Sequence, residues 1–140
     1  MTIVALLCPL TNVLLPKNKA MIIILNILIG VIALLHLYFM WFEMFAWTTK
    51  GRKVFYKFPK DLFEPTKQMA ANQGLYNGFL AAGLIWTFFI ANMEWKTNIA
   101  LFFLSCVVIA GIYGAYSVER KIFFIQALPA ILAILFLFIS

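Results

Sequence analysis

Two ionisable side chains interrupt the first long apolar segment of the chain, and they are its strongest candidates for chemistry. His36 and Glu43 are seven positions apart, so on an α-helix both project from one face, about 10 Å apart along the axis. A charge at the centre of a bilayer costs at least about 2.5–3.5 kcal/mol, and an ionisable residue placed there is a functional hypothesis by default. Glu43 therefore requires a partner, a proton or water.

A second group of polar residues opens the next apolar segment. On a helix these residues occupy an arc of about 140°; they are Asn72, Gln73, Tyr76 and Asn77. Asn77, Gln73 and His36 are candidate partners for Glu43, as are Lys50 and Arg52 reaching back from the following loop. We interpret Glu43, His36, Asn72, Gln73, Asn77 and Tyr76 as a ligand-binding or ion-coupling site. The other interpretation is that the amides only join helices by hydrogen bonds.

Small residues recur every four positions on another arc of the same segment, at Gly74, Gly78 and Ala82. Such a series lets two helices approach closely. It predicts helix packing, within one chain or between two copies, and it says nothing about chemistry.

The elements that carry these residues are predicted to be membrane helices. The chain has 140 residues, of which 65% are hydrophobic and 11% charged, whereas a soluble domain is nearer half apolar and a quarter charged. Four apolar segments are long enough to cross a bilayer and must then be helical. They cover about 21–47, 69–93, 97–117 and 122–139. Short connections favour antiparallel neighbours, so we predict an all-α, integral membrane four-helix bundle with up-down-up-down topology.

Residues 1–20 are predicted to form an interfacial or disordered extension, because their apolar run is too short to span. The net charge of +6 is explained by membrane orientation, and we expect no nucleic-acid partner. Loops 48–68 and 118–121 carry eight of the basic residues. The positive-inside rule therefore predicts that these loops are cytoplasmic and that both termini lie outside.

The first loop alternates basic and aromatic residues from Lys53 to Phe58. This alternation is typical of binding to anionic lipid head groups. Orientation charges combined with aromatic anchors explain it more simply.

Two segments, His36–Trp47 and Ala71–Gly83, resemble a family of small, mainly bacterial membrane proteins known only as domain of unknown function 1304. The likeness covers about Met21 to Ser140. It implies four membrane helices, a location in the bacterial cell membrane, and that the family's own motif includes His36, Glu43, Asn72, Gln73 and Asn77. It implies no activity. A looser likeness in size and helix count, to four-helix membrane enzymes that conjugate glutathione, lacks their arginine-rich motif.

Three functions are compatible with these residues. The first is a protein that binds or transports a small solute, a proton or a cation at a cytoplasmic-side pocket around Glu43 and His36. The second is a structural or interaction protein that stabilises the membrane or a complex. The third is a membrane enzyme for a lipid-like substrate, with His36 or Glu43 as acid or base and Asn77 or Tyr76 as donor. We favour a non-enzyme, since no nucleophile or cofactor pattern is present.

No metal site is predicted, because the chain offers no cluster with metal-ligand spacing, and its two cysteines, Cys8 and Cys106, lie far apart. The cofactor and any catalytic residue stay unassigned. Membrane lipids are the expected partners, and a homo-oligomer is an open alternative to a monomer.

Overall fold

The computed structural model describes residues 19–139, and within this range the chain forms helices and turns without any strand. Most of the predicted N-terminal extension lies outside the described residues. The chain divides into two compact units. We call Ala33–Ala82 the hairpin unit. The described residues before Ala33 and after Ala82 form the terminal unit.

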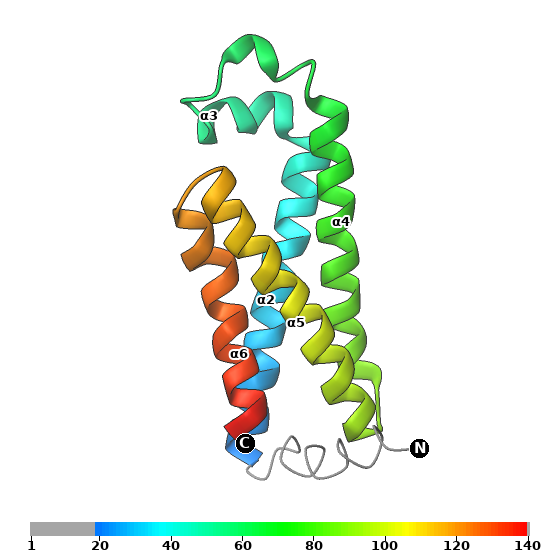
Figure 1. Cartoon of the computed structure of the whole chain (residues 1–140). Coiled ribbons are helices and arrows are strands. Elements are labelled where there is room, and N and C mark those ends of the chain that lie inside the picture. The colour runs from blue at the N-terminus through cyan, green and yellow to red at the C-terminus, as the bar shows by residue number, and fades with distance from the viewer. Residues whose placement is uncertain (1–18, 140) are drawn as a thin grey trace, which may run out of the picture. The chain divides into compact units, whose positions relative to one another are not determined.

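The five α-helices follow the predicted segments, with one addition (Figure 1). They are α2 (Lys19–Phe45), α3 (Arg52–Val54), α4 (Lys67–Trp86), α5 (Met93–Ser117) and α6 (Leu128–Ile139). Two π-helical segments, η1 (Trp47–Gly51) and η4 (Phe123–Ala127), and two 3-10 turns, η2 (Lys60–Leu62) and η3 (Thr87–Phe89), complete the described structure. The all-α prediction is confirmed for this part of the chain.

Several boundaries differ from the predicted ones: α2 ends at Phe45 and not at 47, and the second segment, predicted as 69–93, is α4 from Lys67 to Trp86 followed by the 3-10 turn Thr87–Phe89. The first helix begins at Lys19, inside the segment predicted as an extension. Helix α5, which was predicted to begin at about residue 97, begins at Met93. Asn92 caps it, and its side chain accepts a hydrogen bond of 3.0 Å from the Trp95 backbone N–H. A side-chain oxygen at this position satisfies one of the amide groups that a helix start leaves without a partner.

Of the described helices, α2 and α5 are long and apolar enough to cross a membrane. The helix at Phe123–Phe138 is apolar but shorter. Helix α4, with 20 residues, carries the four polar residues Asn72, Gln73, Tyr76 and Asn77, which lower its hydropathy. Two candidate spans are thus observed, against four predicted.

In the hairpin unit, the end of α2 and the start of α4 run antiparallel and in close contact (Figure 1). Met44 lies against Gly74, and Met40 lies against Gly78. A Cβ atom added at Gly74 would be only 2.8 Å from Met44 Cγ and 3.0 Å from the Met40 carbonyl oxygen. Gly74 therefore allows a helix approach that an alanine would prevent, as small residues do between membrane helices, whereas a Cβ atom at Gly78 would meet only the Met40 side chain.

The segment from Trp47 to Thr66, which connects α2 to α4, has an aromatic core of its own. Phe63 is 0% exposed, and its ring centre lies 5.2 Å from that of Trp47 and 5.1 Å from that of Phe58. The Trp47 indole N–H donates a hydrogen bond of 3.0 Å to the Thr66 hydroxyl. We call this folded segment the cap. A plain loop was predicted here, and the structure replaces it with short helical turns packed around Phe63.

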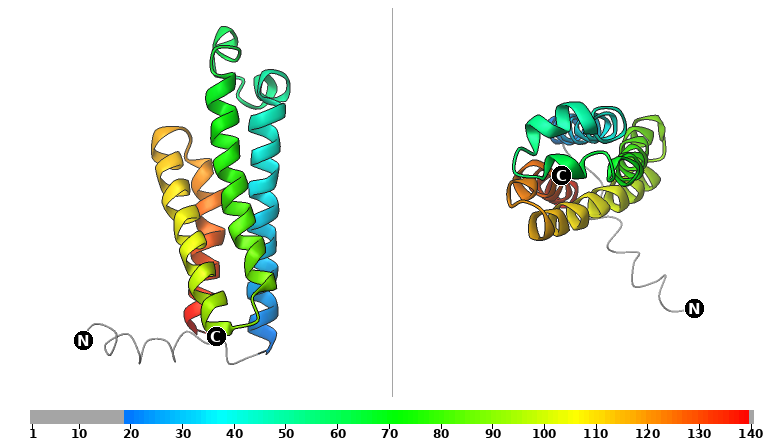
Figure 2. Two further views of the ribbon diagram at one scale, coloured as in Figure 1. Left: turned by 90° about the vertical axis from the view of Figure 1, so that its right-hand side faces the viewer. Right: turned by 90° about the horizontal axis from the view of Figure 1, so that it is seen from above.

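In the terminal unit, α5 packs antiparallel against η4 and α6 (Figure 2). A Cβ atom at Gly111 would be 2.7 Å from the Ala127 backbone nitrogen, and one at Gly114 would be 3.0 Å from Ile122 Cγ2. The π-helical turn η4 directly precedes α6, whose second residue is Pro129. Proline lacks the amide of a regular helix and its ring crowds the preceding turn, and π-turns are a common adjustment of this kind.

Candidate functional site

The polar contact that joins α2 to α4 is a hydrogen bond between Asn77 and Glu43. Asn77 Nδ2 donates to Glu43 Oε2 at 2.7 Å. Asn77 is buried and Glu43 is half-buried. Asn77 was one of several predicted partners for this carboxyl group, and the structure assigns it that role.

The surroundings of Glu43 in the hairpin unit are apolar and close-packed. Gly74 lies directly beside the carboxyl-bearing side chain, since a Cβ atom there would be 3.1 Å from Glu43 Cβ. Met40 and Met44 fill the space over the two glycines. Met44 was not foreseen as a neighbour; its spacing of four residues from Met40, on the face that meets α4, is the signal that could have revealed it.

Two cations that were considered as partners of Glu43 have contacts elsewhere. The Lys50 ammonium lies 4.6 Å from the centre of the Trp41 ring. Arg52 forms an ion pair of 3.7 Å with Glu64 and lies over the Phe63 ring. These contacts hold both side chains within the cap and its junction with α2.

His36 lies two turns before Glu43 on the same face of α2, as predicted, and only 1% of it is exposed. Its ring stands edge-on to Phe39, with 5.8 Å between ring centres. Since seven helical residues span about 10 Å, His36 lies about two turns nearer the N-terminus of α2 than the Glu43–Asn77 pair.

The other predicted site residues of α4 are on its exposed side: Asn72, Gln73 and Tyr76 are all exposed. The reason is the width of the predicted arc, because only part of about 140° can face one neighbouring helix. Asn77 occupies the facing part, together with Gly74 and Gly78. Ala82, the last member of the predicted small-residue series, is exposed, while Ala81 is fully buried.

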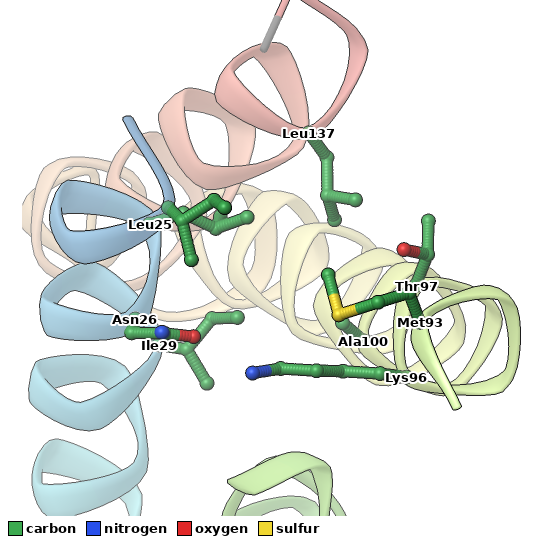
Figure 3. Close-up of a pocket in the computed structure, with 9 residues that line it drawn as sticks. Leu25, Asn26, Ile29, Met93, Lys96, Thr97, Ala100 and Leu137 are labelled. Carbon is green, nitrogen blue, oxygen red and sulfur yellow. The ribbon is translucent and has the colours of Figure 1, made fainter. Parts of the chain in front are cut away.

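A small cavity lies in the terminal unit, between the first turns of α2, the start of α5 and the end of α6 (Figure 3). Its volume is about 20 Å³. Leu25 and Ile29 give it an apolar wall, and the side chains of Asn26 and Lys96 extend toward it from opposite helices (Figure 3). This volume is enough for about one water molecule, so the cavity is too small for an organic solute.

Among residues 19–139, no three His, Cys, Asp or Glu side chains come together in a way that could hold a metal ion. The site therefore consists of one carboxyl group, one carboxamide and the thioethers that pack around them. Such a set can bind and release a proton, accept hydrogen bonds from a small cationic or polar solute, or bridge two helices.

The fold and this site define an all-helical protein with two helices of membrane-spanning length and a polar contact between α2 and α4. The chain belongs to the family described as "Protein of unknown function (DUF1304)", which matches residues 30–138. It is similar to the uncharacterized protein YpaA of Lactococcus lactis, with 30% identity over 117 residues, covering 82% of this chain and 97% of the relative. No solved structure matches.

The Glu43–Asn77 contact predicts a specific response to a second carboxylate. With Asn77→Asp, two carboxyl groups would face each other in place of the hydrogen bond of 2.7 Å between the Asn77 amide and Glu43. Since two adjacent carboxyl groups cannot both ionise, the folded variant must keep a proton that the unfolded chain has already released above about pH 4. Stability then falls as pH rises. We expect a loss of about 2 kcal/mol at pH 8 and recovery toward pH 5.

The measurement is thermal unfolding in detergent at both pH values, with Asn72→Asp as the control. Asn72 is exposed on the same helix, so the same chemical change there should leave the pH dependence at its wild-type level. Identical pH profiles for the two variants would contradict the contact.

Proposed function

We propose that the chain is an integral membrane protein in which α2, α4, α5 and the η4–α6 helix each cross the bilayer. Helices α2 and α5 have 27 and 25 residues, which corresponds to about 40 and 37 Å against a hydrocarbon core of about 30 Å. Only 28% and 22% of their most apolar stretches are buried within the protein. The core helix of a soluble protein is mostly buried, so this exposure supports contact with lipid.

The other two proposed spans are shorter and include 3-10 or π-helical turns. Helix α4 with η3 covers residues 67–89, and η4 with α6 covers 123–139, lengths that reach or just meet the requirement of about 17–25 residues. The distribution of basic residues supports a cytoplasmic location for residues 48–68 and 118–121, with both termini outside.

Within this protein, Glu43 is proposed to be the binding centre for a proton or a small cationic solute, on the cytoplasmic side. The observation that carries the proposal is a half-buried carboxyl group in an apolar helix, bonded to Asn77. An ionised carboxylate has about four acceptor sites, and within the described part of the chain the bond from Asn77 Nδ2 occupies one of them. The remaining acceptors suit a proton or a cation, and an ionisable group within a membrane-spanning helix is costly and by default a functional hypothesis.

A structural role is the second candidate, and the packing beside Glu43 favours it. Gly74 and Gly78 bring the backbone of α4 against Met40 and Met44, and the Asn77 amide joins the same two helices. In this case Glu43 and Asn77 fix the alignment of α2 and α4 and bind nothing else. Because Gly74 and Gly78 already contact α2 in the same chain, they are not a free surface for a second copy.

Proton flux into proteoliposomes distinguishes the two candidates. The purified protein is reconstituted with a pH-sensitive dye inside the vesicles, and a potassium gradient with valinomycin drives proton entry. The wild type should carry protons, and Glu43→Gln, which keeps the shape and removes the ionisable group, should reduce the flux to that of protein-free vesicles. Glu64→Gln is the matched control, because Glu64 is an exposed carboxylate paired with Arg52.

Wild-type flux in Glu43→Gln would exclude the coupling role. A wild type that carries no protons, together with a loss of thermal stability in Glu43→Gln and Asn77→Ala, would instead support the structural candidate. For that case we expect a loss of about 1 kcal/mol, within the range of hydrogen bonds between membrane helices.

A further inference from the structure

We propose that the cap, Trp47–Thr66, together with Lys67 at the start of α4, is a binding surface for the phosphate groups of anionic phospholipids. This inference rests on the proposed membrane location and is independent of any role of Glu43. It assigns a partner to a segment that was predicted as a connecting loop.

The charge of this surface is strongly positive. Six basic residues lie in 47–67 against two acidic ones, Asp61 and Glu64, which leaves a net charge of +4 out of +6 for the whole chain. All six are exposed: Lys50, Arg52, Lys53, Lys57, Lys60 and Lys67. A basic cluster directly beside a membrane helix attracts anionic lipids with about 1 kcal/mol per residue.

The cap holds these charges on a folded support. Phe63 is fully buried beneath Trp47 and Phe58, and the Trp47–Thr66 hydrogen bond connects positions 19 residues apart. A Cβ atom at Gly51 would be 3.3 Å from the Phe63 ring, which places the backbone just before Arg52 close against the aromatic core. The cations are therefore presented from a defined surface, and less conformational entropy is lost on binding than with an unfolded loop.

Exposed apolar side chains lie between the cations of the cap. Val54 and Tyr56, which flank Phe55, are 55% and 74% exposed, and Lys57 extends over the Tyr56 ring. Exposed aliphatic and aromatic groups beside lysines are typical of surfaces that rest at the boundary of head groups and acyl chains. A nucleic acid or an acidic peptide would leave these apolar groups in water, so a lipid surface is the occupant that fits both features.

Position along the chain supports the same occupant. The cap follows directly after α2, which ends at Phe45, and precedes α4, which begins at Lys67. In the proposed topology both ends of the cap thus stand at the level of the lipid phosphates. Tryptophan is common at this level, and Trp47 lies there with its polar N–H bonded to Thr66.

The test is lipid binding to the full chain in a non-ionic detergent, counted by native mass spectrometry. Phosphatidylglycerol and phosphatidylcholine with identical acyl chains are the probes. The wild type should retain phosphatidylglycerol preferentially. Lys53→Gln with Lys57→Gln should lower its apparent affinity about fivefold for each lysine, or about 25-fold together, and leave phosphatidylcholine binding unchanged.

The matched control is Arg120→Gln with Lys121→Gln, which removes two exposed cations from the other predicted cytoplasmic loop. This variant should stay within about twofold of the wild type, because its loop has two cations and no cluster, and Lys121 is paired with Glu119 at 3.6 Å. Inorganic phosphate should not displace phosphatidylglycerol, because it lacks the acyl chains that contact Val54 and Tyr56. Displacement by phosphate would show a free anion site and overturn the lipid assignment.

Equal losses in the two double variants, or no preference of the wild type for phosphatidylglycerol, would also overturn the inference. Tryptic cleavage and circular dichroism of the variants verify that the cap is still folded. Fractionation of the expressing cells separates the two proposals. A chain found in the membrane fraction without lipid preference refutes the lipid surface alone, whereas a chain in the soluble fraction refutes the membrane location as well.

Discussion

Replacing Phe63 by alanine is expected to unfold the cap while α5 and α6 stay folded. Phe63 is the largest fully buried side chain of the described residues, and it contacts Trp47, Phe58 and Gly51. Truncating a buried phenylalanine costs about 3–5 kcal/mol. The cap is a short segment with a small core, so a loss of this size exceeds what its remaining contacts can supply.

The control is Tyr56→Ala, which removes an aromatic ring of similar size from an exposed position in the same segment. Limited trypsin digestion in detergent measures the difference, because Lys53, Lys57 and Lys60 lie in the cap. Phe63→Ala should be cleaved there rapidly, and Tyr56→Ala should resist like the wild type. Equal resistance of all three proteins would mean that the aromatic core does not hold the cap together.

The second large effect is expected at Gly111, where α5 touches η4. A methyl group there would lie 2.7 Å from the Ala127 backbone nitrogen and 3.0 Å from its Cα atom. Backbone atoms cannot rotate away as a side chain can, so α5 and η4 must separate. Gly111→Ala should therefore cost about 3 kcal/mol, at the upper end of the usual range for overpacking.

Gly30→Ala is the matched comparison, since the nearest atom to a Cβ there is Phe88 Cζ at 3.9 Å, an ordinary contact. Both glycines are inside helices, so both variants gain the higher helix propensity of alanine, about 0.5–1 kcal/mol. Gly30→Ala should keep that gain and melt slightly above the wild type. Thermal unfolding of the two variants in one detergent gives the comparison, and a similar decrease for both would contradict the described contact at Ala127.

The helices could be predicted from the sequence because their signals are local. Long apolar runs specified the segments of α2, α5 and η4–α6 to within a few residues, although the start of α5 moved to Met93 because Asn92 caps it. The membrane interpretation gave a reason for these runs. The number of spans stays a prediction, because the polar residues of α4 make its hydropathy ambiguous.

The sequence limited the possible partners of Glu43 to a few residues, but it did not indicate which of them forms the contact. The helical periodicity shows which residues share one face of a helix. It does not show which part of that face packs against a neighbouring helix. Asn77 faces α2 because the flanking Gly74 and Gly78 bring the backbones together there. Asn72, Gln73 and Tyr76, on the rest of the arc, are exposed. Their part in binding stays a prediction.

The cap was not foreseen for a different reason. Its order depends on contacts between residues far apart in the chain, such as Trp47 with Phe63 and with Thr66. The alternation of basic and aromatic residues does not distinguish a folded segment from an unfolded loop. A tryptophan and three phenylalanines within 17 residues (Trp47, Phe55, Phe58 and Phe63) were the available sign that these rings could cluster.

The methionines beside Glu43 give the interface between α2 and α4 a mechanical property. Met40 and Met44 reach over glycines, and their unbranched thioether chains adopt several shapes at little cost. Leucine or isoleucine at these places would have fewer low-energy shapes, whereas the thioether chains can fit small irregularities between the two helices. The side-chain packing next to the carboxyl group can therefore adjust by rotation of Met40 and Met44 when a neighbouring side chain changes shape, while the backbone contact at Gly74 keeps the two helices close.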